Sequence, residues 1–214
     1  MQKILIDYNF ADFTEEKLLH NIDLLPDWRK EQALRFKHFE GRRNCTVALL
    51  LLAECLGVKP ADIPPFQYNE HGKPSLMGQE ARDKGQESRG NSQFSILSSQ
   101  FSISHCHEAV ACMVSDMPCG IDVESVGRYR DSVARYSMDE EQMQHILSSD
   151  DPALAFIRLW TQKEAYLKAL GTGIQDNMRD IPSSLLRRVT HTEVHSDKGY
   201  VLSWCVLENA HKPH

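Results

Sequence analysis

Asp122 and Glu124 are the first residues of the sequence whose types and spacing could do chemistry. They stand in the segment Gly120-Ile121-Asp122-Val123-Glu124, where apolar and polar side chains alternate as in a β-strand. Residues two apart in a strand project from the same face, so both carboxylates would lie side by side. Two adjacent carboxylates repel unless a cation lies between them, and oxygen ligands of this kind suit Mg²⁺. The solvent-facing side of an ordinary amphipathic strand would give the same pattern.

A second group of charged residues lies in an apparently helical segment that ends at Gly171. At about 100° per residue, Glu164 and Lys168 lie together along one edge of an apolar stripe. They could form an ordinary i,i+4 ion pair that contributes a few tenths of a kcal/mol, or they could act together on a ligand. Lys163 falls inside the apolar stripe, so its ammonium must reach solvent or meet an anion.

Two shorter motifs could bind a ligand. Ser104-His105 is followed by Cys106 and His107, but adjacent strand residues diverge and no second ligand pair at zinc spacing exists, so zinc is disfavoured. A histidine and a hydroxyl group at a strand end fit either the edge of a ligand pocket or a hydrogen-bonded core edge. The turn Gly72-Lys73-Pro74 combines close backbone approach with a point charge suited to phosphate, although ordinary turns look the same.

The elements that must position these residues can be predicted from periodicity and from capping signals. We expect a strand at 3–6, helix over 26–56 with a break near Gly41, and a polar surface excursion at 78–100. Within the excursion, Ser92-Gln93-Phe94-Ser95-Ile96 recurs at 99–103, and we take the second copy as the structural strand. Further predicted elements are strands at 66–68, 109–115 and 119–124, helix after 131, a helix from Pro152 to Gly171, and two or three strands in 185–207.

These elements predict an α+β fold with two similar lobes, each a long helix packed on a small antiparallel sheet. We place the boundary between residues 1–116 and 117–214, with the 78–100 excursion in the N-terminal lobe. The two lobes would be related by a pseudo-twofold axis, and the candidate site residues would meet at their interface.

Composition limits the classes of function. The 214 residues are 41% hydrophobic and 25% charged, as in ordinary globular proteins, and the longest apolar stretch, 47–53, is too short to span a bilayer. We expect a cytoplasmic protein, because no signal peptide is recognisable and the six scattered cysteines do not form a disulfide framework. The net charge of −6 argues against a nucleic-acid surface. Between 28 and 43, however, six Lys/Arg oppose two Glu, which favours a compact anionic ligand.

Taken in order, the motifs resemble the 4′-phosphopantetheinyl transferase superfamily. Four segments carry the resemblance, which runs from about 26 to 175: Asn69-x-x-Gly72-Lys73-Pro74, 101–105, 120–124, and Trp160-x-x-Lys163-Glu164-Ala165-Tyr166-Leu167-Lys168-Ala169-Leu170-Gly171. The likeness is greatest to the long, monomeric, two-lobed branch that activates surfactin synthetase. It implies transfer of the 4′-phosphopantetheine group from coenzyme A to a serine of an apo carrier protein (acyl, peptidyl or polyketide), with release of adenosine 3′,5′-bisphosphate.

The resemblance also implies roles for individual residues. Asp122, Glu124 and Glu164 would hold Mg²⁺, Glu164 would act as base for the serine directly or through a water, and Lys168 would neutralise the pyrophosphate. The residues implied in coenzyme A binding are Arg42, Arg43, Gly72, Lys73, Pro74, Ser104, His105 and Lys168. Two features depart from the family pattern or leave it open: the 78–100 excursion is long, and either Cys45 or Thr46 stands where a small hydroxyl residue is expected. Glu140 matches a recurrent acid of the family without an assigned role.

Two other functions stay open on the residues alone. A Mg²⁺-dependent nuclease would also use clustered acids and a lysine, but it needs a basic groove that a chain of net charge −6 does not obviously offer. A non-catalytic module that binds coenzyme A or a carrier protein would have lost part of the site, whereas all the expected acids and the lysine are present. We expect coenzyme A and a carrier protein as partners of a monomer, with neither nucleic acid nor membrane.

Overall fold

The computed structural model describes residues 2–7, 10, 13–78, 98–173 and 178–207. The β-strands are β1 (Gln2–Asp7), β2 (Phe66–Tyr68), β3 (Pro74–Leu76), β4 (Gln100–His105), β5 (Val110–Ser115), β6 (Cys119–Ser125), β7 (Thr190–His195) and β8 (Tyr200–Val206). The α-helices are α1 (Glu15–Asp23), α2 (Asp27–Leu34), α3 (Phe39–Leu56), α5 (Asp131–Ser137), α6 (Glu140–Ser148), α7 (Pro152–Leu170) and α8 (Ser183–Val189). Short 3₁₀ turns are η1 (Pro60–Asp62), η2 (Val126–Arg128) and η3 (Met178–Asp180).

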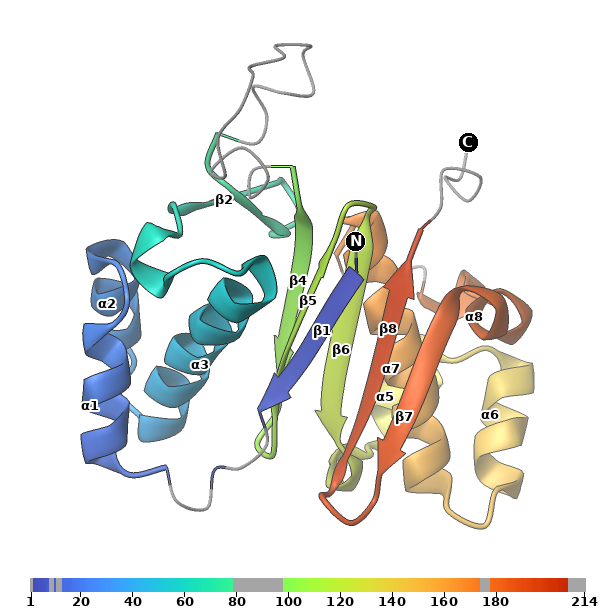
Figure 1. The fold of residues 1–214 in the computed structure, drawn as a ribbon. Coiled ribbons are helices and arrows are strands. Elements are labelled where there is room, and N and C mark those ends of the chain that lie inside the picture. The colour runs from blue at the N-terminus through green and yellow to red at the C-terminus, as the bar shows by residue number, and fades with distance from the viewer. Residues whose placement is uncertain (1, 8–9, 11–12, 79–97, 174–177, 208–214) are drawn as a thin grey trace.

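Two antiparallel sheets stand side by side in the middle of the molecule, with helices outside them (Figure 1). One sheet has the strand order β1-β5-β4 and the other β6-β8-β7, while β2 and β3 form a separate hairpin. Helices α1 to α3 lie beyond the first sheet and α5 to α8 beyond the second (Figure 1). The predicted α+β class is therefore confirmed. The lobe boundaries and the pseudo-twofold relation stay predictions.

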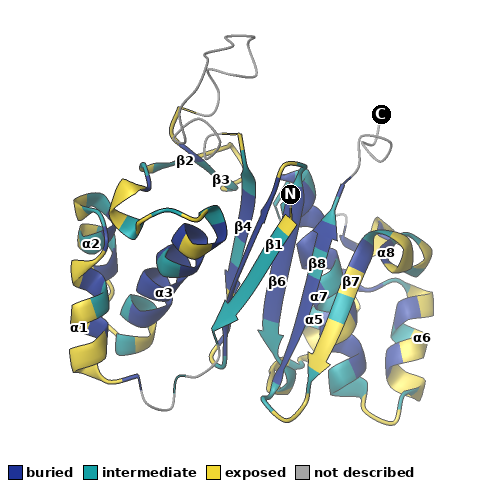
Figure 2. Ribbon diagram, in the orientation of Figure 1, coloured by how far each residue is buried: buried dark blue, intermediate teal, exposed yellow. Residues whose placement is uncertain are grey.

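The alternation of side chains along the strands explains this layering. On β5, Val110, Cys112 and Val114 pack with α3 in the core of the N-terminal part, whereas Ala111 and Met113 face the other way. They meet Ile121, Val123 and their neighbours in a cluster between the two sheets. A third cluster lies under α7. Burial follows the same order, since the central strands are buried and the exposed side chains lie mainly on the outer helices (Figure 2).

The two long helices confirm the strongest sequence signals. Helix α7 begins after Asp151, whose side chain accepts a hydrogen bond from Leu154 N at 3.0 Å, and has Pro152 in its first turn. It ends at Gly171, which has the left-handed φ of +77°. Helix α3 ends in the same way at Gly57, with φ +70°. No helix within the described ranges combines the length and the apolar composition needed to cross a membrane.

Three details differ from the prediction. The break in the 26–56 helix falls between Arg35 and His38, and Gly41 lies inside α3. A Cβ at Gly41 would come within 2.7 Å of the Phe36 ring. Residues 183–189 are helix rather than strand, since Leu186 and its neighbours pack on α7 at helical spacing. Helix α1, capped by Thr14, was not predicted.

The 78–100 excursion falls almost entirely on residues 79–97, outside the described residues. The prediction that the second copy of the repeated segment forms the strand is confirmed by β4. Its first copy, 92–96, lies outside the described residues.

Candidate active site

The candidate site forms where β4, β6 and α7 meet. Gly120 on β6 makes this approach possible, because a Cβ there would lie 2.0 Å from Ala165 O and 2.5 Å from Ala169 N of α7. The helix backbone thus lies directly against the strand. Strand β4 is not in the same sheet as β6, but Ile121 N donates a 3.1 Å hydrogen bond to Ser102 Oγ. These contacts bring three segments distant in sequence to one point.

Asp122 is at the centre of the site. Its side chain is buried, and its Oδ1 accepts hydrogen bonds from Ser104 Oγ at 2.8 Å and from Lys168 Nζ at 2.6 Å. Lys168 Nζ also donates to Ser104 Oγ at 3.0 Å and to Ile121 O at 3.2 Å. Lys168 therefore bonds to the strand carboxylate. The predicted alternative, an i,i+4 ion pair with Glu164, is not among the ion pairs of the described residues.

Glu164 lies one helical turn before Lys168 and is only 7% exposed. Burial raises the pKa of its carboxyl group to about 7; the negative charges of Asp122 and Glu124 add to this effect, and the positive charge of Lys168 opposes it. The structure therefore brings the three predicted carboxylates within electrostatic reach of one another. A carboxyl group with a pKa near 7 is suited to accept a proton at neutral pH.

Two oxygen atoms of the site show how a cation would fit. Asp122 Oδ2 and Glu164 Oε1 are buried and have no hydrogen-bond partner among the described residues. Buried carboxylate oxygens without partners are costly, and a hard cation such as Mg²⁺ satisfies them. The donor set therefore fits the predicted metal at these two residues.

Glu124, the third predicted ligand, is paired with Arg128. Its carboxylate accepts from Arg128 Nη1 at 3.1 and 3.2 Å and from Ser125 N at 3.1 Å. Within the part of the chain that the structure describes, no three His, Cys, Asp or Glu side chains converge closely enough to hold a metal ion. To complete a three-carboxylate set of ligands, Glu124 would have to break its ion pair with Arg128 and bind the cation instead.

A groove of about 700 Å³ opens beside Glu124, between the N-terminal and C-terminal parts of the molecule. His105, at the end of β4, lies on its wall, and its Nδ1 is 3.4 Å from Asn44 Nδ2. The other residues lining it are Phe36, Lys37, His38, Glu40, Gly41, Asn44, Cys106, His107, Ser125, Gly127 and Arg128. Lys37 belongs to the basic run noted in the sequence, but neither it nor Arg128 was singled out. Only the packing of α3 on the sheet of β4 and β5, and of β4 against β6, shows that they line a common groove.

Arg42 and Arg43 do not line this groove, and both have partners. Arg42 Nη2 forms an ion pair with Glu15 at 2.9 Å. Arg43 is buried, donates to His107 O at 3.1 Å, and has its guanidinium 3.8 Å from the centre of the Phe10 ring. Their binding of coenzyme A stays a prediction that requires these contacts to open.

The Gly72-Lys73-Pro74 turn lies at the C-terminal end of α7, next to the helical turn that carries Lys168. Lys73 Nζ donates to Ala169 O at 3.1 Å and to Cys119 O at 3.3 Å. Gly72 has φ +82°, and Pro74 begins β3. The structure therefore gathers Ser104, His105 and the acids with Lys168, while Lys73 contacts the start of β6 and the last turn of α7.

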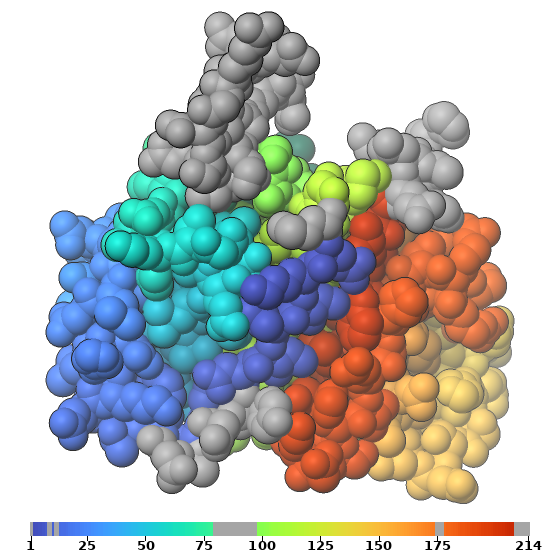
Figure 3. Space-filling view, in the orientation of Figure 1, coloured from blue at the N-terminus to red at the C-terminus, as the bar shows by residue number. Residues whose placement is uncertain are grey.

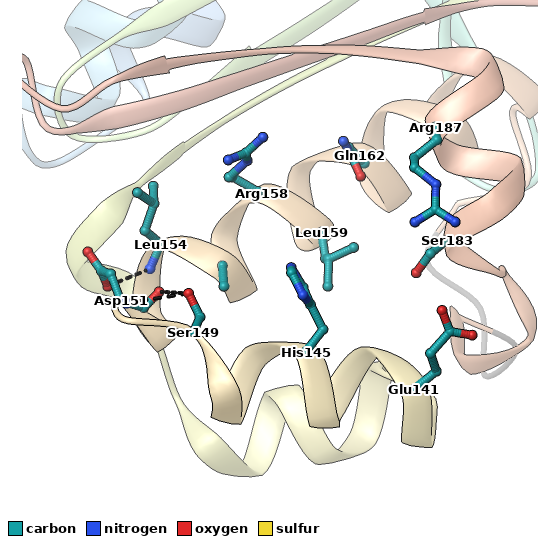
Figure 4. Close-up of a pocket in the computed structure, with 11 residues that line it drawn as sticks. Glu141, His145, Ser149, Asp151, Leu154, Arg158, Leu159, Gln162, Ser183 and Arg187 are labelled. Atoms are coloured by element: carbon teal, nitrogen blue, oxygen red, sulfur yellow. Dashed lines mark hydrogen bonds between the residues drawn. The ribbon is translucent and has the colours of Figure 1, made fainter.

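A second hollow of about 460 Å³ lies on the opposite face of α7, between α6 and α8 (Figure 4). Arg158 and Leu159 reach it from α7, His145 from α6 and Arg187 from α8 (Figure 4). It contains none of the predicted site residues. Residues that line this hollow can therefore serve as control positions for substitutions at the candidate site.

Comparison with known proteins gives two findings. Residues 118–212, which include β6 and α7, match the family model described as the 4′-phosphopantetheinyl transferase superfamily. The 4′-phosphopantetheinyl transferase gsp of Aneurinibacillus migulanus is 33% identical over 72 residues, which are 33% of this chain and 30% of that protein. The match thus spans about a third of that curated relative. Over residues 118–212 the chain is therefore similar to the 4′-phosphopantetheinyl transferase superfamily, in agreement with the resemblance of its motifs.

Proposed function

We propose that this protein transfers the 4′-phosphopantetheine group of coenzyme A to a serine of an apo carrier protein and releases adenosine 3′,5′-bisphosphate. The family match over residues 118–212 supports the reaction type. The observation that carries the assignment is the buried cluster of Asp122, Glu164 and Lys168, with two unpartnered carboxylate oxygens, beside a groove. Phosphoryl transfer depends mainly on positioning and charge neutralisation, which this cluster can supply.

The groove is the proposed site for the nucleotide part of coenzyme A. Lys37 and Arg128 bring positive charge to its lining, and His38 and His105 add imidazole groups. These groups suit phosphate oxygens, and the volume of about 700 Å³ is within the range of ligand sites. We expect a monomer to be active, because the motifs are most similar to the monomeric branch of the superfamily.

The residues of the cluster would divide the chemistry as follows. Glu164 accepts the proton of the serine hydroxyl as its oxygen attacks the β-phosphorus, and the bond to the bridging oxygen of the pyrophosphate breaks. The bond electrons leave with adenosine 3′,5′-bisphosphate, whose new charge Lys168 is placed to neutralise. Ser104 holds both Asp122 and Lys168 through one hydroxyl group. Mg²⁺ held by Asp122, Glu164 and a reoriented Glu124 would supply further neutralisation of the pyrophosphate.

The test is to incubate the protein with coenzyme A, Mg²⁺ and a panel of apo carrier proteins and to weigh the carriers by mass spectrometry. We expect a mass gain of one phosphopantetheine group, lost in Glu164→Gln and in Lys168→Met. Glu141→Gln, an exposed glutamate in the second hollow, is the matched control and should keep full activity.

Other outcomes would favour the alternatives. No mass gain on any carrier would reject the transferase assignment. Tight coenzyme A binding without transfer would indicate a binding module. Mg²⁺-dependent nicking of plasmid DNA, sensitive to Glu164→Gln, would indicate a nuclease.

A further inference from the structure

The turn between β2 and β3 is ordered by the side chain of Asn69. Its Oδ1 accepts hydrogen bonds from the backbone N–H of His71 at 3.0 Å and of Lys73 at 2.8 Å. Gly72 supplies the left-handed φ of +82° that the turn needs, and its N–H donates to Asn69 O at 3.0 Å. Asn69 therefore fixes the direction in which the Lys73 side chain leaves the turn.

Both residues reach from this hairpin to the C-terminal end of α7. Asn69 Nδ2 donates to Gly171 O at 2.8 Å, and Lys73 Nζ donates to Ala169 O at 3.1 Å. The last four carbonyls of a helix have no intrahelical donor, and the helix dipole favours a cation beside them. Lys73 thus satisfies an otherwise unpaired group of α7 from a segment 96 residues away in sequence.

The hairpin and the helix end are also complementary in shape. A Cβ added to Gly171 would lie 3.1 Å from Lys73 Cδ and 3.4 Å from Asn69 Nδ2. A Cβ at Gly173 would lie 3.2 Å from His71 O. The backbone after α7 therefore runs directly against the turn, at a separation where an added Cβ would force its neighbours to move.

Lys73 also bonds to the strand that carries the site. Its Nζ donates to Cys119 O, at the start of β6, at 3.3 Å. One ammonium group thus joins β6 to α7 at Cys119 and Ala169, and Lys168, the neighbour of Ala169, joins the same two elements through Ile121 O and Asp122. Between them, Gly120 lies against the helix backbone. A shift of the helix end would move Lys168 relative to Asp122.

We propose that Asn69 and Lys73 are positioning residues that hold the end of α7 against β6, and so keep Lys168 and Glu164 in register with Asp122. Their effect on the reaction rests on the proposed function, but the clamp itself does not. The competing role for Lys73 is a phosphate ligand of coenzyme A. Lys73 is half-buried, already donates to two carbonyls and does not line the groove.

Two variants and one control distinguish the positioning role of Lys73 from a role as phosphate ligand. Lys73→Met keeps the length of the side chain and removes its charge. Asn69→Asp keeps the oxygen that orders the turn, but places a carboxylate oxygen where Nδ2 donates to Gly171 O. Lys59→Met changes an exposed lysine whose side chain forms no hydrogen bond or ion pair with the described residues. For each folded variant, the measurements are coenzyme A affinity by calorimetry, kcat and KM, and amide hydrogen exchange of the last turn of α7.

We expect Lys73→Met and Asn69→Asp to speed exchange at residues 167–171 at least fivefold and to lower kcat about tenfold or more, since small displacements of reacting groups are costly. The Kd for coenzyme A should stay within about twofold of wild type, and Lys59→Met should change nothing. Normal exchange in both variants would overturn the clamp. So would a tenfold weaker Kd in Lys73→Met with unchanged kcat, which would make Lys73 a phosphate ligand. If the wild-type protein proves inactive, the proposed function fails, and the exchange data still decide the clamp.

Discussion

At the scale of single residues, the two lysines of α7 differ in what surrounds them. Lys168 bonds to a carboxylate that faces the site, whereas Lys163 is fully buried and donates to three neutral oxygens: Ser137 O at 2.8 Å, Gln142 Oε1 at 2.6 Å and Met178 O at 2.7 Å. The expectation that Lys163 would reach solvent or an anion was therefore wrong. Burial lowers its pKa to about 8, so at neutral pH most molecules keep the three donors that three acceptors require.

Lys163→Met is expected to lower the free energy of unfolding by about 3 kcal/mol, because it leaves buried acceptors without donors. Lys168→Met, one turn further along, should cost less stability while abolishing transfer. Urea denaturation of both variants beside wild type measures the difference. Equal stability of the two variants would show that the Lys163 contacts do not support the fold.

The stability of the metal-free protein is expected to depend on pH through Glu164. Its pKa is raised from 4.5 to about 7 in the folded state, so between these values the folded protein holds a proton that the unfolded chain has lost. This contribution is fully present below pH 4.5 and is lost as the pH rises through 7, a change on the order of 3 kcal/mol. Glu164→Gln should remove it.

Urea denaturation in the presence of a chelator, at pH 5 and at pH 7.5, tests this expectation. Between the two pH values wild type should lose about 2–3 kcal/mol more than Glu164→Gln. Glu141→Gln, an exposed carboxyl group, should keep the wild-type pH dependence. Identical pH dependence of Glu164→Gln and wild type would contradict the raised pKa.

At the scale of elements, the contact of β6 with α7 organises the site. It depends on a glycine, because the strand and the helix backbones approach too closely for any side chain at Gly120. Lys73 and Lys168 then join the two elements on either side of Gly120. A precise carboxylate–lysine geometry is thus built on a strand and a helix, which are more rigid supports than loops.

Gly120→Ala is expected to destabilise the fold by about 3 kcal/mol or more, since the added Cβ would meet helix backbone at 2.0 Å and neither element can yield cheaply. Gly127→Ala, where a Cβ would meet nothing within 4 Å, is the control and should be near neutral. Thermal unfolding measures both. Near-wild-type stability of Gly120→Ala would show that β6 and α7 can separate without loss.

At the scale of the whole molecule, the inner faces of the two sheets share one apolar cluster. It combines β1 and β5 with β6 and β8 and includes the fully buried Met113, Ile121 and Tyr200. In the space-filling view, β1 adjoins the C-terminal strands directly (Figure 3). Separating the two parts would expose this cluster to water, so their stabilities are coupled.

We therefore expect one cooperative unfolding transition for the whole chain. Trp28 reports on the N-terminal core, and Trp160 and Trp204 report on the C-terminal part. Fluorescence of Trp28→Phe and of the double variant Trp160→Phe/Trp204→Phe should give the same midpoint after correction for the stability of each variant. Two separate midpoints within wild type, seen by calorimetry, would show that the parts unfold independently.

The sequence by itself determined the local features of the site. Alternation along β6 put Asp122 and Glu124 on one face, helical spacing put Glu164 beside Lys168, and Asp151 and Gly171 marked the ends of α7, because each depends only on residues a few positions apart. The tertiary structure decided the partners. Ser104 forms a hydrogen bond with Asp122, 18 residues away, and Arg42 pairs with Glu15, 27 residues away. Lys73 donates to Ala169 O at the end of α7, 96 residues away. Such pairings follow from how sheets and helices pack, which spacing along the chain cannot express.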